Sequence, residues 1–116
     1  MAILAIGSVS ACGKKDTTPT EVLKAFVGAL QTRDAAALKR TMSKKMLSNL
    51  EEQAKRAKKP FDEFLVNAGP PPTMPEIRNE KIAGDKATLE IKYPELDFWK
   101  ELKFLKEDGA WKLDSD

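Results

Sequence analysis

The sequence contains no histidine, one cysteine and one tyrosine among its 116 residues. Histidine is the commonest acid–base group near neutral pH and a frequent metal ligand, so its absence removes the usual parts of such sites. With no imidazole and a single thiol, a zinc or copper site lacks suitable ligands, and no disulfide can form within the chain. We therefore expect no metal site and no cofactor.

A long apolar run is also absent. Residues 1–9 are uncharged and mostly apolar or small, but a helix that spans a bilayer needs about 20 apolar residues. The shorter length suits the apolar part of a secretory signal peptide. Val9, Ser10 and Ala11 precede the lone Cys12, and together these four residues look like a bacterial lipobox, where a signal peptide is cut and the new N-terminal cysteine receives lipid.

This motif predicts a lipoprotein signal peptide at 1–11, a polar tether at 12–17 and one folded domain at 18–116. Lipid on Cys12 would hold the protein to a bacterial membrane in the cell envelope, on the periplasmic side or at the cell surface. Signal peptides open with basic residues, and their absence predicts a start codon upstream of Met1. In a competing interpretation, residues 2–9 are a buried element of a cytosolic domain and Cys12 is a core residue.

Charge is unevenly distributed along the chain. The formal net charge of +2 is too small to indicate nucleic-acid binding. From Lys14 to Lys59 there are 12 basic and 5 acidic residues, whereas residues 60–116 carry 8 basic and 13 acidic ones. The basic side chains of the first half either contact anionic lipid headgroups or an acidic partner, or form the solvated faces of amphipathic helices; the second interpretation is favoured. These residues are Lys39, Arg40, Lys44, Lys45, Lys55, Arg56, Lys58 and Lys59.

Start signals predict helices in the first half of the chain. Thr18 and Glu21 fit a capping box, with a proline in the first turn, and predict a helix over residues 19–32. Asp34 and Ser43 are expected to cap two further helices. An apolar stripe recurs at helical spacing in each of these segments. A fourth, short helix is expected after Pro60, ended by Gly69 and Pro70.

A proline-rich stretch at 70–75 separates these helices from the second half, where the period becomes alternating. Ala87, Leu89, Ile91 and Tyr93 are expected to share one face of a strand. The alternation predicts strands near 77–82, 87–93, 98–104 and 110–113, with turns at 83–86 and 108–109. Helices followed by an antiparallel meander make an α+β domain, in which N-terminal helices pack on one face of a curved antiparallel sheet.

In this order of segments the chain resembles the nuclear transport factor 2-like superfamily, and more closely small bacterial lipoproteins with an uncharacterised domain of that lumazine-binding-like type. The resemblance covers residues 18–114 and is carried by segments 18–26, 33–34, 80–87 and 106–113. It implies a cone-shaped fold with a pocket between sheet and helices, used for small-molecule chemistry or for binding alone. Fold does not decide between these uses.

The residues for an acid–base site are few. Tyr93 and the carboxylates Asp85, Asp97 and Glu101 are the groups available, and the carboxylates fall in turns or on polar faces, where they are expected to be solvated. The sequence therefore does not favour an enzyme. A pocket lined by aromatic side chains that binds a ligand is the alternative to a catalytic site. Its candidate residues are Tyr93, Phe98, Leu102, Phe104 and Trp111.

Two functions remain open at this point. The favoured one is a membrane-tethered, non-enzymatic binding or interaction module for an unknown protein or small molecule. The alternative is a pocket enzyme or small-ligand carrier of the nuclear transport factor 2-like type. An exposed sheet face often forms a dimer in the superfamily that the chain resembles, so Trp99 and Leu105 are candidates for a homodimer interface.

Overall fold

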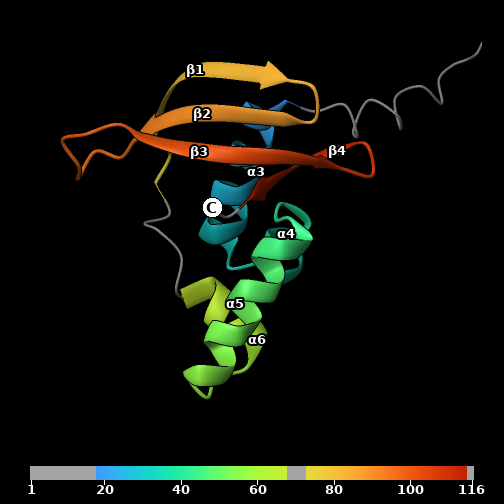
Figure 1. The fold of residues 1–116 in the computed structure, drawn as a ribbon. Helices are drawn as coiled ribbons and strands as arrows, with labels where there is room; N and C mark the ends of the chain where they lie inside the picture. The colour runs from blue at the N-terminus through green and yellow to red at the C-terminus, as the bar shows by residue number, and fades with distance from the viewer. Residues whose placement is uncertain (1–17, 68–72, 115–116) are drawn as a thin grey trace, which may run out of the picture.

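The computed structural model describes residues 18–67 and 73–114, in which four helices precede four strands (Figure 1). The helices are α3 (Pro19–Thr32), α4 (Ala35–Arg40), α5 (Lys44–Arg56) and α6 (Phe61–Asn67); the strands are β1 (Glu76–Ala83), β2 (Lys86–Lys92), β3 (Lys100–Glu107) and β4 (Ala110–Asp114). The sheet is antiparallel throughout, with its strands in chain order. The predicted α+β class is confirmed. The predicted signal peptide and tether, with Cys12, and the Gly69–Pro70 stop lie outside the described residues.

The three predicted helix caps are present. The Thr18 hydroxyl accepts from the Glu21 backbone N–H at 3.2 Å, and the Glu21 carboxylate accepts from the Thr18 N–H at 3.1 Å, which completes a capping box. Asp34 accepts from Ala37 N–H at 3.1 Å, and the Ser43 hydroxyl accepts from the N–H at the third position of α5. Each cap satisfies a backbone donor that would otherwise lack a partner at a helix start.

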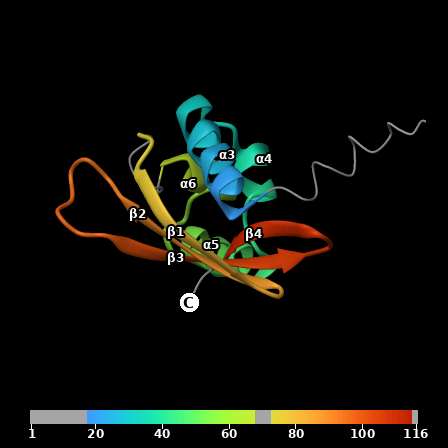
Figure 2. The same cartoon turned by 90° about the horizontal axis from the view of Figure 1, so that it is seen from above.

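Helix α3 lies across one face of the sheet and supplies much of the core (Figure 2). Its apolar side packs against the alternate residues of β2, and both sets are buried as the alternation predicted. The buried residues of α3 are Pro19, Val22, Leu23, Phe26, Val27, Ala29 and Leu30. Because these side chains fill the space between α3 and β2, the core lies where the sheet and its first helix meet.

Helix α4 packs against α3, helix α6 packs against both α4 and α5, and α5 and α6 extend away from the sheet (Figure 1). Of the 13 residues in α5, only Ala54 is buried, and its apolar residues Met46, Leu47 and Leu50 are half-buried against the core. The Arg33 guanidinium donates to Asn67 Oδ1 at 2.6 Å and so links the ends of α3 and α6. This helical part is therefore held to the rest by fewer fully buried side chains than α3 is.

The last strand has a short partner outside the four-stranded sheet. Met42 forms a parallel bridge with Leu113, in which Leu113 N–H donates to Thr41 C=O at 2.6 Å and Ser43 N–H donates to Leu113 C=O at 2.7 Å. The segment between α4 and α5 thus covers part of the β4 edge. An unpaired strand edge exposes backbone donors and acceptors, and these two bonds satisfy some of them.

The third strand begins later than the alternation predicted. Phe98 was expected in one alternating run with Leu102 and Phe104, but it lies in the loop before β3 and is 57% exposed. Pro94 follows Tyr93 and the chain turns there, as the Leu96 N–H to Tyr93 C=O bond of 3.0 Å shows. Proline cannot donate to a sheet ladder, so pairing resumes only at Lys100.

Candidate functional site

The strand register assigns every sheet residue to one of two faces, because cross-strand partners point to the same side. One row runs across all four strands on the helix-covered side, and its last three members are buried: Ile82, Ala87, Phe104 and Leu113. The next row points to the opposite side and is polar: Lys81, Thr88, Lys103 and Asp114. We call this opposite side the outer face.

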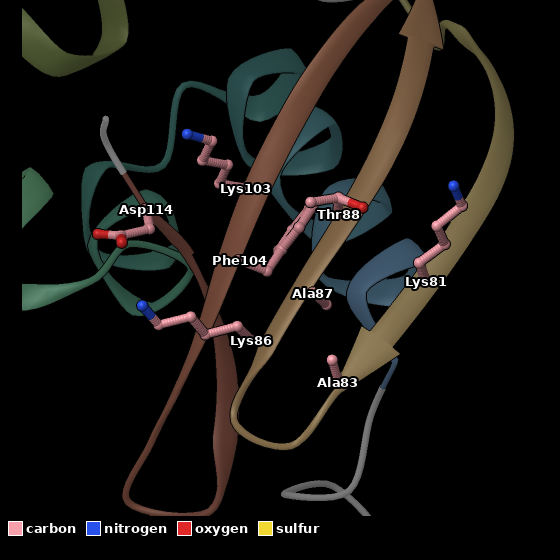
Figure 3. Close-up of a pocket in the computed structure, with 8 residues that line it drawn as sticks. All are labelled: Lys81, Ala83, Lys86, Ala87, Thr88, Lys103, Phe104 and Asp114. Carbon is pink, nitrogen blue, oxygen red and sulfur yellow. The ribbon is translucent and has the colours of Figure 1, made fainter.

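A hollow of about 340 Å³ lies on the outer face near the turn that joins β1 and β2 (Figure 3). In Figure 3 the helices lie behind the sheet, and lysine side chains extend from three different strands around the hollow. We call it the lysine hollow. Its lining residues are Lys81, Ala83, Lys86, Ala87, Thr88, Lys103, Phe104 and Asp114.

The charges around the lysine hollow are mostly positive. Lys81, Lys86 and Lys103 line it together with one carboxylate, Asp114, whose Oδ1 already accepts a hydrogen bond of 2.7 Å from the Ser43 hydroxyl. Within the part of the chain that the structure describes, neither Lys81 nor Lys86 forms a salt bridge. The hollow is therefore a shallow cationic site with a hydroxyl, from Thr88, at its centre.

The neighbouring row of the outer face consists of Arg78, Glu90 and Glu101 and carries more negative than positive charge. Arg78 Nε donates to Glu90 Oε1 at 2.8 Å, and Asn79 Nδ2 donates to the same oxygen at 2.7 Å. These two hydrogen bonds, led by that of Arg78, lower the pKa of the Glu90 carboxyl. The Arg78 guanidinium also stacks on Trp99, with 3.8 Å between its carbon and the ring centroid. The excess of positive charge is thus confined to the turn end of the face.

A β-bulge brings Lys81 to this face. Arg78 pairs with Glu90 and Lys81 with Thr88, so Asn79 and Glu80 together oppose a single residue of β2. Asn79 occupies the left-handed region, with φ of 55°, which asparagine tolerates better than most residues. Without the extra residue, the alternation would turn Lys81 toward the helices.

The same bulge ties the start of α3 to the strand. Glu80 Oε1 accepts from the Thr20 N–H at 3.0 Å and from the Thr20 hydroxyl at 2.6 Å. A carboxylate at a helix start also interacts favourably with the helix dipole. Because Glu80 directly precedes Lys81, the first turn of α3 lies beside the strand segment that lines the lysine hollow.

The predicted aromatic pocket residues lie in different places. Tyr93, Phe104 and Trp111 belong to the buried core, and Leu102 is half-buried against it. Phe98 is exposed in the loop before β3 and is separate from that core. Phe104 also lines the lysine hollow, whereas Trp111 lines a second hollow.

The second hollow, of about 300 Å³, lies between the helices and β4. Trp111 and Val22 contribute its apolar part, and Glu21, Arg40 and Lys112 its charged part. Several of these polar groups already have partners: Glu21 completes the capping box, and Lys112 Nζ donates to Arg40 C=O at 2.6 Å. We regard it as the lesser of the two hollows because its polar groups serve the fold.

The groups proposed for acid–base chemistry are spread over the second half of the molecule. Asp85 lies in the turn between β1 and β2, Asp97 in the loop before β3 and Glu101 on β3, and all three are exposed. Tyr93 is only 8% exposed, and burial, with a smaller contribution from Glu95, raises the pKa of its phenol. Among residues 18–67 and 73–114, no group of three acidic or cysteine side chains is positioned to hold a metal ion.

The basic residues of the helical half have mixed surroundings. Lys39 Nζ pairs with Asp62 at 2.6 Å and lies over the Phe61 ring, 5.2 Å from its centroid. Arg56 pairs with Glu52 at 3.4 Å. Lys55, Lys58 and Lys59 are exposed at and beyond the C-terminal end of α5. None of the eight basic residues singled out in the sequence lines the lysine hollow, and only Arg40 lines the second one.

The candidates for a homodimer interface are Trp99, which directly precedes β3, and Leu105, near the end of β3. Both are half-buried. The interface therefore stays a prediction. In the described parts of the chain, no helix combines the length and the apolar character that crossing a membrane requires.

Sequence reasoning missed the lysines of the hollow because charge counted over half a chain hides a local cluster. The two-residue turn at Gly84 and Asp85 carried a usable signal, since it sets Lys81 opposite Thr88. The position of Lys103 beside Thr88 depends on the pairing of β2 with β3, which are joined by a longer loop.

The chain matches no known family when compared with family models, and no match appears among curated proteins or solved structures.

Proposed function

We propose that this chain is a lipid-anchored protein of the bacterial cell envelope whose folded part is a non-enzymatic binding module. The lysine hollow is its binding site. The observation that carries the proposal is the contact between Thr20, in the first turn of α3, and Glu80, which directly precedes Lys81 of the hollow. This contact lies only eight residues after Cys12 in the chain, although the hollow itself opens on the opposite face of the sheet. A binding site at this place lies close to the membrane to which a lipid on Cys12 would hold the protein.

The N-terminal sequence supports the anchor. A short uncharged apolar run ends in Val9, Ser10 and Ala11 before the only cysteine, and a polar segment follows. More than one acyl chain is needed for stable attachment, and lipoprotein processing supplies several. A nuclear transport factor 2-like fold is part of the proposal; the order of helices followed by an antiparallel meander supports it.

Intact-mass analysis tests the anchor directly. The gene with its native upstream region is expressed in a bacterium, and membrane and soluble fractions are separated before mass measurement. We expect a membrane-bound chain that begins at Cys12 and carries acyl mass, and we expect Cys12→Ser to abolish both. Lys14→Ser serves as the matched control, because it introduces a serine two residues away and leaves the motif intact.

An unmodified wild-type chain that keeps residues 1–11 and stays in the soluble fraction would contradict the anchor. A chain that is cut elsewhere and carries no lipid would contradict it equally. A Cys12→Ser chain that keeps the acyl mass would place the lipid on another residue and remove the role assigned to Cys12.

A further inference from the structure

We propose that the lysine hollow binds the phosphate-bearing headgroup of an anionic lipid in the membrane to which the chain is attached. This inference rests on the proposed function for the location of the protein at a membrane. The charge of the lysine hollow does not depend on that proposal. The ligand class is a phosphate monoanion or diester with an organic substituent, and its source is a lipid bilayer.

The arrangement of charge carries the first step. Lys81, Lys86 and Lys103 come from three adjacent strands and line the same hollow as Thr88, so three ammonium groups on either side and one hydroxyl border a single region of the sheet. Ammonium groups are strong donors to phosphate oxygens, and a hydroxyl adds a further donor. The one lining carboxylate, Asp114, accepts a hydrogen bond from the Ser43 hydroxyl at 2.7 Å and keeps its charge, so three positive charges face one negative charge. The lining of the hollow is therefore complementary to an anion.

The shape of the hollow favours a surface ligand over an enclosed one. It lies on an exposed sheet face and has about 340 Å³ of space. Ala83 is the exposed apolar residue of its lining, whereas the side chains of Ala87 and Phe104 are buried on the helix-covered side, so a ligand meets mainly polar and charged surface. An open site of this kind suits a ligand that stays part of a larger surface, such as a bilayer.

The position of the hollow selects the membrane as that surface. Thr20, in the first turn of α3, is bonded to Glu80, the residue before Lys81. Cys12 precedes Thr18 by six residues, which span at most about 20 Å when fully extended. A lipid on Cys12 therefore keeps Lys81 within reach of the headgroup layer.

An exposed apolar residue lies at the same end of the sheet. Ile82 follows Lys81 near the end of the edge strand β1 and is 52% exposed; it belongs to the row on the helix-covered side, so it lies around the edge of β1 from Lys81. Apolar side chains next to lysines are typical of surfaces that contact the membrane interface, where the apolar group inserts and the ammonium groups meet phosphates. Two carboxylates are close by in the sequence, Glu80 before Lys81 and Asp85 before Lys86, and they reduce the local charge.

Vesicle binding by two matched triple variants tests the proposal. Both are made in the full-length Cys12→Ser chain, so that lipid on the protein plays no part. The first replaces the hollow lysines by glutamine: Lys81→Gln, Lys86→Gln and Lys103→Gln. The second removes the same charge from the far end of α5: Lys55→Gln, Lys58→Gln and Lys59→Gln. All six side chains are exposed, and circular dichroism checks that each variant folds.

The probe is a vesicle of phosphatidylcholine with about one-third phosphatidylglycerol, compared with phosphatidylcholine alone. We expect the hollow variant to bind the anionic vesicles about tenfold to 100-fold more weakly than the parent chain, because each lysine near an anionic surface contributes substantially to binding. The α5 variant should lose about threefold or less, because its lysines lie away from the proposed contact and are screened. Binding to phosphatidylcholine alone should be weak for all three.

Equal losses in the two variants would overturn the proposal, because they would show attraction through diffuse charge. No binding of the parent chain to anionic vesicles would overturn it as well. A separate arm adds millimolar inorganic phosphate or glycerol phosphate. If either soluble anion displaces the vesicles or binds as tightly as they do, the ligand is a free phosphate and the assigned lipid source is wrong.

The two experiments test the anchor and the lipid-binding site independently of each other. Lipid on Cys12 is read from the mass of the native chain, whereas headgroup binding is read from a chain that lacks Cys12. A missing lipid with selective vesicle binding would remove the anchor and keep the site. A lipid-modified chain whose hollow variant binds like the parent would keep the anchor and remove the ligand.

Discussion

Among single residues, Tyr93 reports most directly on the folded state, because it is the only tyrosine in the chain. Its phenol is buried at the end of β2, and that burial raises its pKa above the ordinary value of 10.0. A group whose pKa is raised by folding contributes stability that is complete below its unfolded pKa. That contribution is lost as the pH rises through the folded pKa.

We therefore expect the stability of the protein to fall at alkaline pH as Tyr93 is forced to ionise. Absorbance of the tyrosinate measures the titration without interference from a second tyrosine. The midpoint in the native protein should lie above the midpoint in urea, and Tyr93→Phe should weaken the alkaline loss of stability. Equal midpoints in native and unfolded protein would show that the phenol is solvated in the fold.

At the scale of the element, the β-bulge in β1 makes the most specific prediction. Asn79 has a φ of 55° and opposes Leu89 together with Glu80. In a regular strand glycine is less favourable than alanine, but at a positive φ the order reverses. We expect Asn79→Ala to be less stable than Asn79→Gly by about 1 kcal/mol, measured by urea denaturation.

Both variants remove the Asn79 amide and its bond to Glu90, so their difference isolates the backbone. If Asn79→Ala proves the more stable of the two, the bulge residue does not adopt the left-handed conformation. Lys81 would then lose the register that directs it to the outer face.

Structural features that depend on neighbouring residues in the sequence were predictable. Features that depend on how distant strands pair were not. The caps at Thr18, Asp34 and Ser43 and the Asp108–Gly109 turn depend on side chains within a few residues, and all are present. The bulge at Asn79 has no comparable signal because an asparagine also fits a regular exposed strand. The lysine hollow depends on that bulge and on the pairing of β3, so neighbouring residues alone did not indicate it.

At the scale of the whole molecule, buried side chains are unevenly distributed among the helices. Seven residues of α3 are buried, but only one is buried in α5 and one in α6. Local opening requires little free energy where few apolar side chains are fully buried. We expect amide hydrogen exchange in native protein to be fastest in α5 and α6 and slowest in α3 and β2. Uniform protection across all four elements would show that the fold opens only as one unit.

The two hydrogen bonds from Thr20 to Glu80 also determine how the molecule bears mechanical load. A pull on the chain ahead of Thr18 enters at the first turn of α3 and passes through Glu80 into β1. There it meets the interstrand hydrogen bonds of the sheet. Helices α4, α5 and α6 take no part in these two hydrogen bonds, so this connection between the first turn of α3 and β1 bypasses α5 and α6, each of which has one buried residue.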